Sequence, residues 1–373
     1  MIYLDNAATT YKKPARVYRV VNKAIRKYAA NPGRSSHRLA LKATEIIYDA
    51  REVVSNFFGL NEPENVIFTQ NATYALNIAI KGMINRRCHV IISDLEHNSV
   101  LRPINALCDS IGIEYSVFRS GTDNVFKEIE SLIRPDTAFV ITTLASNVTG
   151  KEIPLLALSE IKKRYNIGLI IDASQLAGHK RIDLSRYAFD AFVAPGHKAL
   201  FGIMGGGFCI FSSSAKAKTI IDGGSGSESV SAHMPEKNPE RFEAGTLALP
   251  AIASIAEGIR FIEKRGIERV EEEISVLTNR LKEMLCGVRG INIYGGENGV
   301  LSFTLDGMST EGVSAALDKK GICTRAGLHC APLAHKTYGT LDSGTVRISV
   351  SCLNTVNDIE KAYEGLLDIR RRS

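Results

Sequence analysis

The sequence predicts an α/β fold, in which a mostly parallel sheet is covered by helices on both faces and a smaller C-terminal α+β domain follows. Three observations predict it. Short apolar runs alternate with helical patterns, the runs are apolar throughout rather than at every second residue, and the pattern changes after about residue 250. Strands that are apolar on both sides are typical of a parallel sheet buried between helices.

Helices are predicted over residues 14–28 and 38–58, where apolar residues recur at helical spacing and Gly59 ends the second pattern. The predicted strands are seven short apolar runs, namely Val66–Phe68, Val90–Ile92, Tyr115–Val117, Phe139–Ile141, Leu169–Ile171, Phe192–Val193 and Phe208–Ile210. Ligand sites of such sheets lie at the carboxyl ends of the strands.

The C-terminal third begins with two long helical patterns and continues with shorter elements. These are helices over 251–265 and 268–286, strands over 300–305 and 346–350, a helix near 310–320 and a last helix from about Thr355. We therefore expect a large cofactor-binding domain of residues 13–249, and a small domain made of residues 1–12 and 250–373.

Composition excludes several classes of protein. The chain has 373 residues, of which 45% are hydrophobic and 23% charged, and a net charge of +6 with scattered Lys and Arg, so no nucleic-acid partner is expected. No apolar run is long enough to span a bilayer, and the first residues lack the features of a signal peptide. The seven cysteines have irregular spacing and no CxxC motif, which indicates a reducing cytoplasm.

The most informative residues are a carboxylate and a lysine that follow neighbouring strands. The run Leu169–Ile171 leads into Asp172, and a strand over residues 191–194 leads into Pro195-Gly196-His197-Lys198. A lysine can form a Schiff base with an aldehyde, and a carboxylate can hold a pyridinium nitrogen. A single loop lysine is usually only solvated, but the presence of Asp172 and other polar strand ends favours a pyridoxal phosphate (PLP) site.

Other polar residues follow the strands, and each has an ordinary structural alternative. Thr73 opens a helix where a phosphate would bind, although its segment also fits a plain helix cap. His97 would stack on a flat ring and move protons, or lie in a surface loop. Asn147 would bond a ring hydroxyl or the substrate, or form a turn. Gln175 would reach the ring oxygen, and His197 would bind phosphate or cap its loop.

Cys330 is the candidate nucleophile among the cysteines. Its segment, Thr324–Leu333, has no helical or strand period and is predicted to be a loop. Nearby in sequence are four residues that would favour a thiolate, namely Arg325, His329, His335 and Lys336. Buried packing of the cysteine is one alternative. A metal site is another, with the possible ligands Cys323, His329, Cys330 and His335.

Arg347 lies in a strand-like segment, Gly344–Val350, whose other residues are mostly apolar. An inward guanidinium would grip a substrate carboxylate with two hydrogen bonds. An arginine on an edge strand that faces water is the alternative.

Together these segments resemble the class V aminotransferase-like PLP enzymes, and within them the cysteine desulfurases and selenocysteine lyases. The matched segments, in order, are Tyr3–Thr9, Asn31–Arg34, Glu96–Ser99, Ser146–Gly150, Asp172–Gln175, Gly196–Lys198, Arg241–Thr246, Arg325–Pro332 and Arg347. The resemblance covers nearly the whole chain and implies the type I fold of PLP-dependent transferases.

The resemblance also implies a role for each site residue. Lys198 would hold PLP and shuttle a proton, Asp172 would pair with the pyridine nitrogen, and Gln175 would contact the ring O3′. His97 would stack on the ring. The phosphate would be bound by Thr73, His197 and, from the neighbouring subunit of a homodimer, Thr246.

For the substrate, the resemblance implies that Arg347 and Asn147 bind L-cysteine. Cys330 would then take its sulfur as a persulfide while L-alanine is released. Selenocysteine lyase is an alternative, as is another class V aminotransferase or β-lyase in which Cys330 is dispensable, and a non-catalytic sulfur-carrier or metal-binding protein is a remote one. Leu328 departs from the family's Gly-His-His-Cys pattern. The choice between sulfur and selenium, and the protein that accepts the sulfur, stay open.

Overall fold

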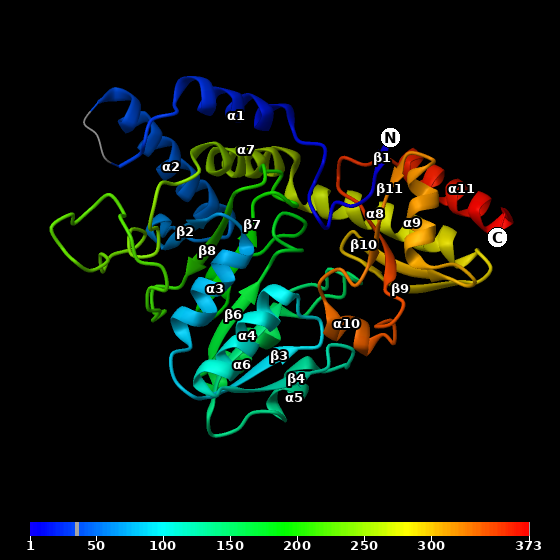
Figure 1. Cartoon of the computed structure of the whole chain (residues 1–373), viewed down its shortest axis with the longest axis horizontal. Helices are drawn as coiled ribbons and strands as arrows, with labels where there is room; N and C mark the ends of the chain where they lie inside the picture. The colour runs from blue at the N-terminus through cyan, green and yellow to red at the C-terminus, as the bar shows by residue number, and fades with distance from the viewer. Residues whose placement is uncertain (34–36, 373) are drawn as a thin grey trace.

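The computed structural model describes residues 1–33 and 37–372, so Arg34 of the matched segment Asn31–Arg34 lies outside the described residues. Figure 1 shows two lobes side by side, a large lobe built on one sheet and a small lobe built on another. The large sheet has the strand order β2-β8-β7-β6-β5-β3-β4. Its strands are β2 (Val66–Thr69), β3 (His89–Ser93), β4 (Glu114–Phe118), β5 (Thr137–Thr143), β6 (Gly168–Asp172), β7 (Ala191–Pro195) and β8 (Gly207–Phe211).

The large sheet is mostly parallel, which confirms the predicted fold class. From β7 through β6, β5 and β3 to β4 every pair is parallel, whereas β8 runs antiparallel to both β2 and β7. All seven predicted apolar runs are strands of this sheet. The carboxyl ends of the five parallel strands therefore meet at one edge, as the sequence predicts.

Helices cover both faces of this sheet, and the strand period of two explains why the runs are apolar throughout. Leu169 and Ile171 of β6 pack in one core with α2, α6 and α7, while Ile170 between them packs in a second core with α3 and α4. The helices of the large lobe are α1 (Ala15–Lys27), α2 (Arg38–Phe57), α3 (Ala72–Met83), α4 (Asn98–Ile111), α5 (Val125–Glu130), α6 (Leu155–Tyr165) and α7 (Leu249–Arg265), with 3-10 turns at Pro63–Asn65 and Leu184–Arg186.

The small lobe is an antiparallel sheet of order β12-β13-β10-β9 with helices packed against it. Its elements are α8 (Ile267–Cys286), β9 (Ile291–Glu297), β10 (Val300–Leu305), α9 (Thr310–Asp318), β12 (Arg325–Gly327), α10 (Pro332–Thr337), β13 (Thr345–Ser349) and α11 (Val356–Arg372). The N-terminal strand β1 (Ile2–Tyr3) pairs in parallel with β11 (Ile322–Cys323), which ties the first residues to this lobe. The domain boundary near residue 250 stays a prediction, and α7, which begins there, packs against α1 and α2.

The prediction of a loop over Thr324–Leu333 was wrong, because the short strand β12 and the start of α10 lie within it. A strand of three residues is too short to show a period of two, and its pairing with β13 across a gap of about twenty residues leaves no local signal. Within residues 1–33 and 37–372, no helix is both long and apolar enough to cross a membrane.

The two lobes are joined through the loop that follows β5. In this loop the carbonyl of Val148 accepts a hydrogen bond from Ser302 Oγ (2.6 Å), and the carbonyl of Gly150 accepts one from Asn298 Nδ2 (2.9 Å). Gly150 has a φ of +75°, and a Cβ atom there would lie 1.8 Å from the carbonyl oxygen of Glu297. Only glycine therefore permits this approach of the two backbones.

We predict that Gly150→Ala destabilises the protein much more than a matched change at Gly112. Both glycines have positive φ, but a Cβ atom at Gly112 (φ +69°) meets nothing within 4 Å. Gly112→Ala should cost about 1 kcal/mol, the backbone penalty alone, and Gly150→Ala roughly 1–3 kcal/mol more because the lobes must separate. Chemical denaturation of both variants measures the difference, and equal losses would contradict this account.

Candidate functional site

A cavity of about 260 Å³ lies at the carboxyl ends of the parallel strands, where the small lobe meets the large one. It brings together nine of the predicted site residues: Thr73, His97, Asn147, Asp172, Gln175, His197, Lys198, Cys330 and Arg347. Thr246, the tenth, is not among them. It lines a separate cavity of about 340 Å³ with Arg51 and Glu243, which form a buried ion pair.

The ends of β6 and β7 place Asp172 and Lys198 in this cavity. The two strands are parallel, and Asp172 is in register with Val193, so the loops after them open at the same edge. Asp172 Oδ1 accepts a hydrogen bond from the backbone N–H of Ser174 (2.9 Å), which fixes the carboxylate. Desolvation lowers the pKa of Lys198 to about 8, and the charge of Asp172 opposes that shift. A lysine with this pKa has a substantial neutral fraction near physiological pH, as Schiff-base chemistry requires.

The ring-binding candidates are held by neighbouring backbone groups. His97 is the N-cap of α4, and its Nδ1 accepts from the N–H of Ser99 (3.0 Å). Burial lowers the pKa of His97 to about 4, so the imidazole is neutral and can stack on a ring without a charge. Gln175 Nε2 donates to the carbonyl of Ala7 (3.2 Å), which brings the N-terminal segment to the wall of the cavity.

Of the phosphate candidates, Thr73 lies in the first turn of α3 and His197 in the loop after β7. Asn71 caps this helix by accepting the N–H of Tyr74 (3.0 Å), and the remaining N–H groups of the first turn have no partner within a helix. The strand β8 approaches so closely that a Cβ atom on Gly207 would lie 2.9 Å from the nitrogen of Ala72. His197 is neutral, since burial lowers its pKa to about 4, and its buried Nδ1 has no hydrogen-bond partner in the described chain. A helix start with free N–H groups suits a phosphate.

The residues of the cavity therefore fit PLP. They offer a carboxylate for a pyridinium, a desolvated lysine for an aldehyde and a helix start for a phosphate.

Arg347 and Asn147 lie at the wall that the small lobe supplies. Arg347 is 1% exposed on β13 and donates from Nη2 to Asp5 Oδ1 (2.7 Å) and from Nη1 to the carbonyl of Asn147 (3.0 Å). The alternative of a water-facing edge arginine is therefore wrong. The Asn147 side chain is not free in this structure, because its Nδ2 donates to the carbonyl of His329 (2.6 Å).

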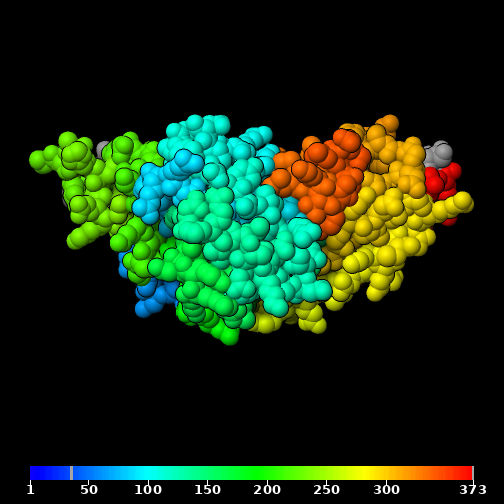
Figure 2. Space-filling model, turned by 90° about the horizontal axis from the view of Figure 1, so that it is seen from below, coloured from blue at the N-terminus to red at the C-terminus, as the bar shows by residue number. Residues whose placement is uncertain are grey.

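Cys330 is exposed at the mouth of the cavity. Its backbone has a positive φ, which is uncommon for residues other than glycine. His329 and Cys330 have φ values of 48° and 59°. The carbonyl of Cys330 accepts the N–H of Asn98 (2.7 Å) at the start of α4. Together with the Asn147 bond to His329, this fixes the segment from both sides, and Figure 2 shows the orange segment around α10 next to the cyan α4. The alternative of buried packing is wrong for this cysteine.

The two histidines near Cys330 in sequence supply no positive charge to it. His329 bonds Thr345 and His335 bonds Thr340, both in the interior, and burial lowers the pKa of each, that of His329 to about 2. Of the expected cations, Arg325 and His329 line the cavity, and since His329 is neutral, Arg325 is the one that carries a charge there. Within the described residues, no group of three or more His, Cys, Asp or Glu side chains is arranged to hold a metal ion.

Two acidic residues of the site were not predicted. Asp5 was quoted only as part of a matched segment, and nothing local signals its bond to Arg347, 342 residues away. Glu96 lies fully buried beside the site, where its Oε1 accepts from the N–H of Thr143 (3.0 Å) and from Ser93. Burial raises the pKa of Glu96 to about 8, and nearby Asp172 contributes to the shift, so the protonated form of this side chain predominates at physiological pH.

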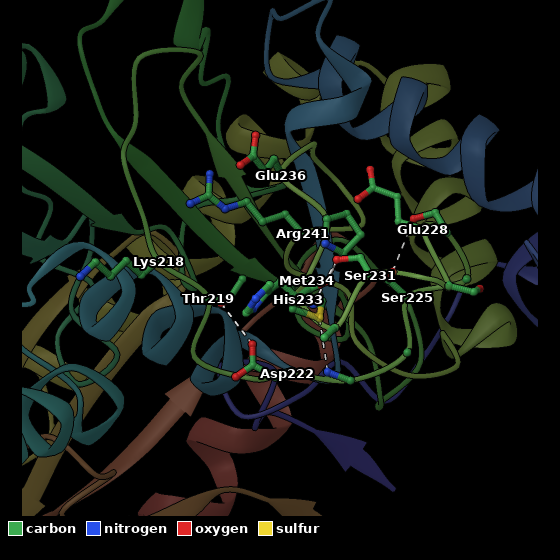
Figure 3. A pocket seen from close by; sticks show the side chains of 17 residues that line it. Lys218, Thr219, Asp222, Ser225, Glu228, Ser231, His233, Met234, Glu236 and Arg241 are labelled. Carbon is green, nitrogen blue, oxygen red and sulfur yellow. Dashed lines mark hydrogen bonds between the residues drawn. The ribbon is translucent and has the colours of Figure 1, made fainter.

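A larger cavity, of about 990 Å³, lies elsewhere. It is lined by residues 218–241 alone, a Ser- and Gly-rich segment between β8 and α7. Figure 3 shows polar side chains of this segment around the hollow, with a hydrogen bond from Thr219 to Asp222 (3.3 Å). None of the predicted site residues lines it.

We predict that Glu96→Gln removes a pH dependence of stability. The native carboxyl has a pKa of about 8 against an ordinary 4.5, so the folded state binds the proton more tightly and loses stability as the pH rises through that interval. The parent should therefore lose stability from acid to alkaline pH through this group, whereas Glu96→Gln should not. The free energy of unfolding of the variant minus that of the parent should increase over this range. Denaturation at several pH values measures it, with the exposed Glu283→Gln as the control. Parallel curves for Glu96→Gln and the parent would contradict the burial argument.

Comparison with known proteins gives one consistent result. A probable cysteine desulfurase of Methanothermobacter thermautotrophicus is 30% identical, over 99% of this chain and 94% of the relative's length. A probable cysteine desulfurase of Halalkalibacterium halodurans is 28% identical, over 98% of this chain and 92% of the relative's length. The apo structure of a cysteine desulfurase from Thermococcus onnurineus superimposes with a TM-score of 0.93 at 29% identity, covering 100% of this chain and 95% of that one. The model of the aminotransferase class-V family matches residues 2–362. The chain belongs to the aminotransferase class-V family.

Proposed function

We propose that the chain is a PLP-dependent cysteine desulfurase, which releases L-alanine from L-cysteine and takes the sulfur onto Cys330. The observation that carries the proposal is the single cavity of about 260 Å³ that Lys198, Asp172, Arg347 and Cys330 all line. Relatives called cysteine desulfurases, similar over nearly the full length, support it.

Bound PLP supplies an electron-withdrawing ring that stabilises negative charge at the α-carbon of an amino acid. Asp172 would hold the pyridine nitrogen and keep it protonated, while Lys198 would hold the aldehyde carbon and later carry the α-proton. Gln175 would contact the ring O3′, and His97 would stack on the ring as a neutral imidazole. Thr73, His197 and the first turn of α3 would hold the phosphate.

The substrate is positioned from the small lobe. Arg347 receives the α-carboxylate of L-cysteine, and Asn147 adjoins this position. Cys330 then faces the substrate sulfur, because its segment is fixed between Asn98 and Asn147 at the cavity mouth. The sulfur of Cys330 attacks the substrate sulfur to form the new S–S bond, the electron pair of the broken carbon–sulfur bond goes to the β-carbon, and a proton bound there in place of the sulfur completes L-alanine.

The remaining assignments concern partners and place. Thr246 lines a different cavity of this chain, which supports its assignment to the phosphate of a neighbouring subunit in a homodimer. A further protein would accept the persulfide sulfur. All seven cysteines are free, which supports a reducing cytoplasm as the compartment.

We predict that Cys330→Ala abolishes sulfur transfer but leaves the cofactor site intact. Release of alanine and sulfide from L-cysteine should fall by about 100-fold or more, because the nucleophile is removed, while the absorption of bound PLP stays unchanged. Cys323→Ala, which removes a partly buried cysteine on β11, is the control and should keep full turnover. Undiminished turnover of Cys330→Ala would favour a transaminase or β-lyase.

We also predict that PLP uptake by the cofactor-free chain depends on the protonation of Lys198. Only the neutral amine condenses with an aldehyde, and the pKa of Lys198 is about 8. The rate should therefore rise about tenfold per pH unit at lower pH and level off above the pKa. Stopped-flow absorbance measures it, with Lys198→Ala as the control that binds no borohydride-reducible PLP. A rate that still rises about tenfold per pH unit well above the pKa, as for an ordinary lysine, would contradict the desolvated lysine.

A further inference from the structure

We infer that Asp5 is a positioning residue, which orients the guanidinium of Arg347 so that its remaining N–H groups receive the carboxylate of an amino-acid substrate. The inference deepens the proposed function and rests on it for the role of Arg347. It assigns a task to the N-terminal segment, which supplies no predicted site residue.

The first support is how the guanidinium is bound. Two of its nitrogens are committed, Nη2 to Asp5 Oδ1 (2.7 Å) and Nη1 to the carbonyl of Asn147 (3.0 Å). Its third nitrogen, Nε, is buried and has no hydrogen-bond partner in residues 1–33 and 37–372. Because Arg347 lines the cavity, a carboxylate that enters would meet a donor that is already oriented.

The second support is that Asp5 itself cannot move freely. Its backbone forms a parallel bridge with Ser349, two residues along β13 from Arg347. The next residues are bound to the same place, since Asn6 Nδ2 donates to the carbonyl of Ser349 (2.9 Å) and the N–H of Ala7 donates to Ser349 Oγ (2.9 Å). The carboxylate is therefore held at a fixed position relative to the strand that carries Arg347.

The third support is the balance of charge around the site. Arg325 on β12 is directly opposite Arg347 on β13, and both line the cavity. Asp5 neutralises one of these two cations, and in the described chain Arg325 has no carboxylate partner. Burial lowers the pKa of Arg347, an effect that Asp5 opposes. One positive charge thus remains for a substrate anion.

A competing role for Asp5 is that of a stand-in, a carboxylate that occupies the substrate position and must be displaced. Asp5 is not among the residues that line the cavity, and the Nε donor is left unused beside it. These observations favour positioning. If Asp5 positions Arg347, removal of its carboxylate should weaken the binding of a substrate carboxylate. If Asp5 is a stand-in, the same change should strengthen that binding, so one titration separates the two roles.

The test compares ligands with and without a carboxylate. The PLP-loaded enzyme is titrated with L-alanine and with L-alaninamide, and the absorption of bound PLP reports the affinity for each. The parent should prefer L-alanine by about tenfold or more, as expected for one charge-assisted contact. Asp5→Ala should lose most of that preference through weaker binding of L-alanine, while L-alaninamide binds as before. Asp5→Asn, which keeps an acceptor for Nη2 but not the charge, should lie between them.

Glu273→Ala is the matched control. It removes a carboxylate of similar exposure, on α8 of the small lobe, from its partner Arg265 at the end of α7, outside the site (N···O 2.7 Å). It should lower thermal stability without changing the preference for L-alanine. If Asp5→Ala folds poorly, Asp5→Asn carries the test.

Each outcome decides something. Unchanged or tighter binding of L-alanine by the Asp5 variants would overturn the inference, as would a parent enzyme with no preference for the carboxylate. A preference that depends on Asp5, in an enzyme that releases no sulfur from L-cysteine, would support the inference and refute the desulfurase. Desulfuration of L-cysteine, by an enzyme whose preference for L-alanine over L-alaninamide does not change in the Asp5 variants, would support the desulfurase and refute the inference.

Discussion

The contact between the loop Ser146–Gly150 and the small lobe is the constraint on which the site depends. Asp172 ends β6 of the large sheet and Lys198 lies in the loop after β7, whereas Arg347 and Cys330 belong to the small lobe. Their separation is set where backbone carbonyls of this loop bond Ser302 and Asn298, at a distance that only a glycine at position 150 allows. The same loop carries Asn147, whose side chain and carbonyl reach the segment of Cys330 and the guanidinium of Arg347. A shift of this loop would move every small-lobe group relative to the lysine.

Desolvation sets the protonation of the groups that this contact encloses. Lys198, His97 and His197 all have lowered pKa values, and the pKa of Glu96 is raised, because each would be charged where little water remains. The two histidines are therefore neutral, Glu96 is mostly protonated, and the amine of Lys198 has a reactive neutral fraction. The cavity keeps its charge in few places, chiefly Asp172 and the arginines, where a zwitterionic cofactor and substrate need opposite charges.

Much of this arrangement could be predicted from the sequence, because it follows from local patterns. Apolar runs marked every strand of the large sheet, and the rule that parallel strands end at one edge brought Asp172 and Lys198 together. The environment of Cys330 was predicted less well. His329 and His335 are near it in sequence, but their imidazoles bond Thr345 and Thr340 in the interior and are not charged. Asp5 and Glu96 could not be assigned roles, since their partners are set by β13 pairing with the N-terminus and by β5 beside β3.

The central claim is that one cavity unites the lysine that holds the cofactor with the cysteine that takes the sulfur. The most direct measurement is to incubate the PLP-loaded protein briefly with L-cysteine, trap thiols and persulfides by alkylation, and locate the added sulfur by mass spectrometry of the peptides. The account predicts one extra sulfur atom on the peptide that contains Cys330, in step with the alanine formed. Alanine formation with the extra sulfur on another cysteine, or on none, would contradict it.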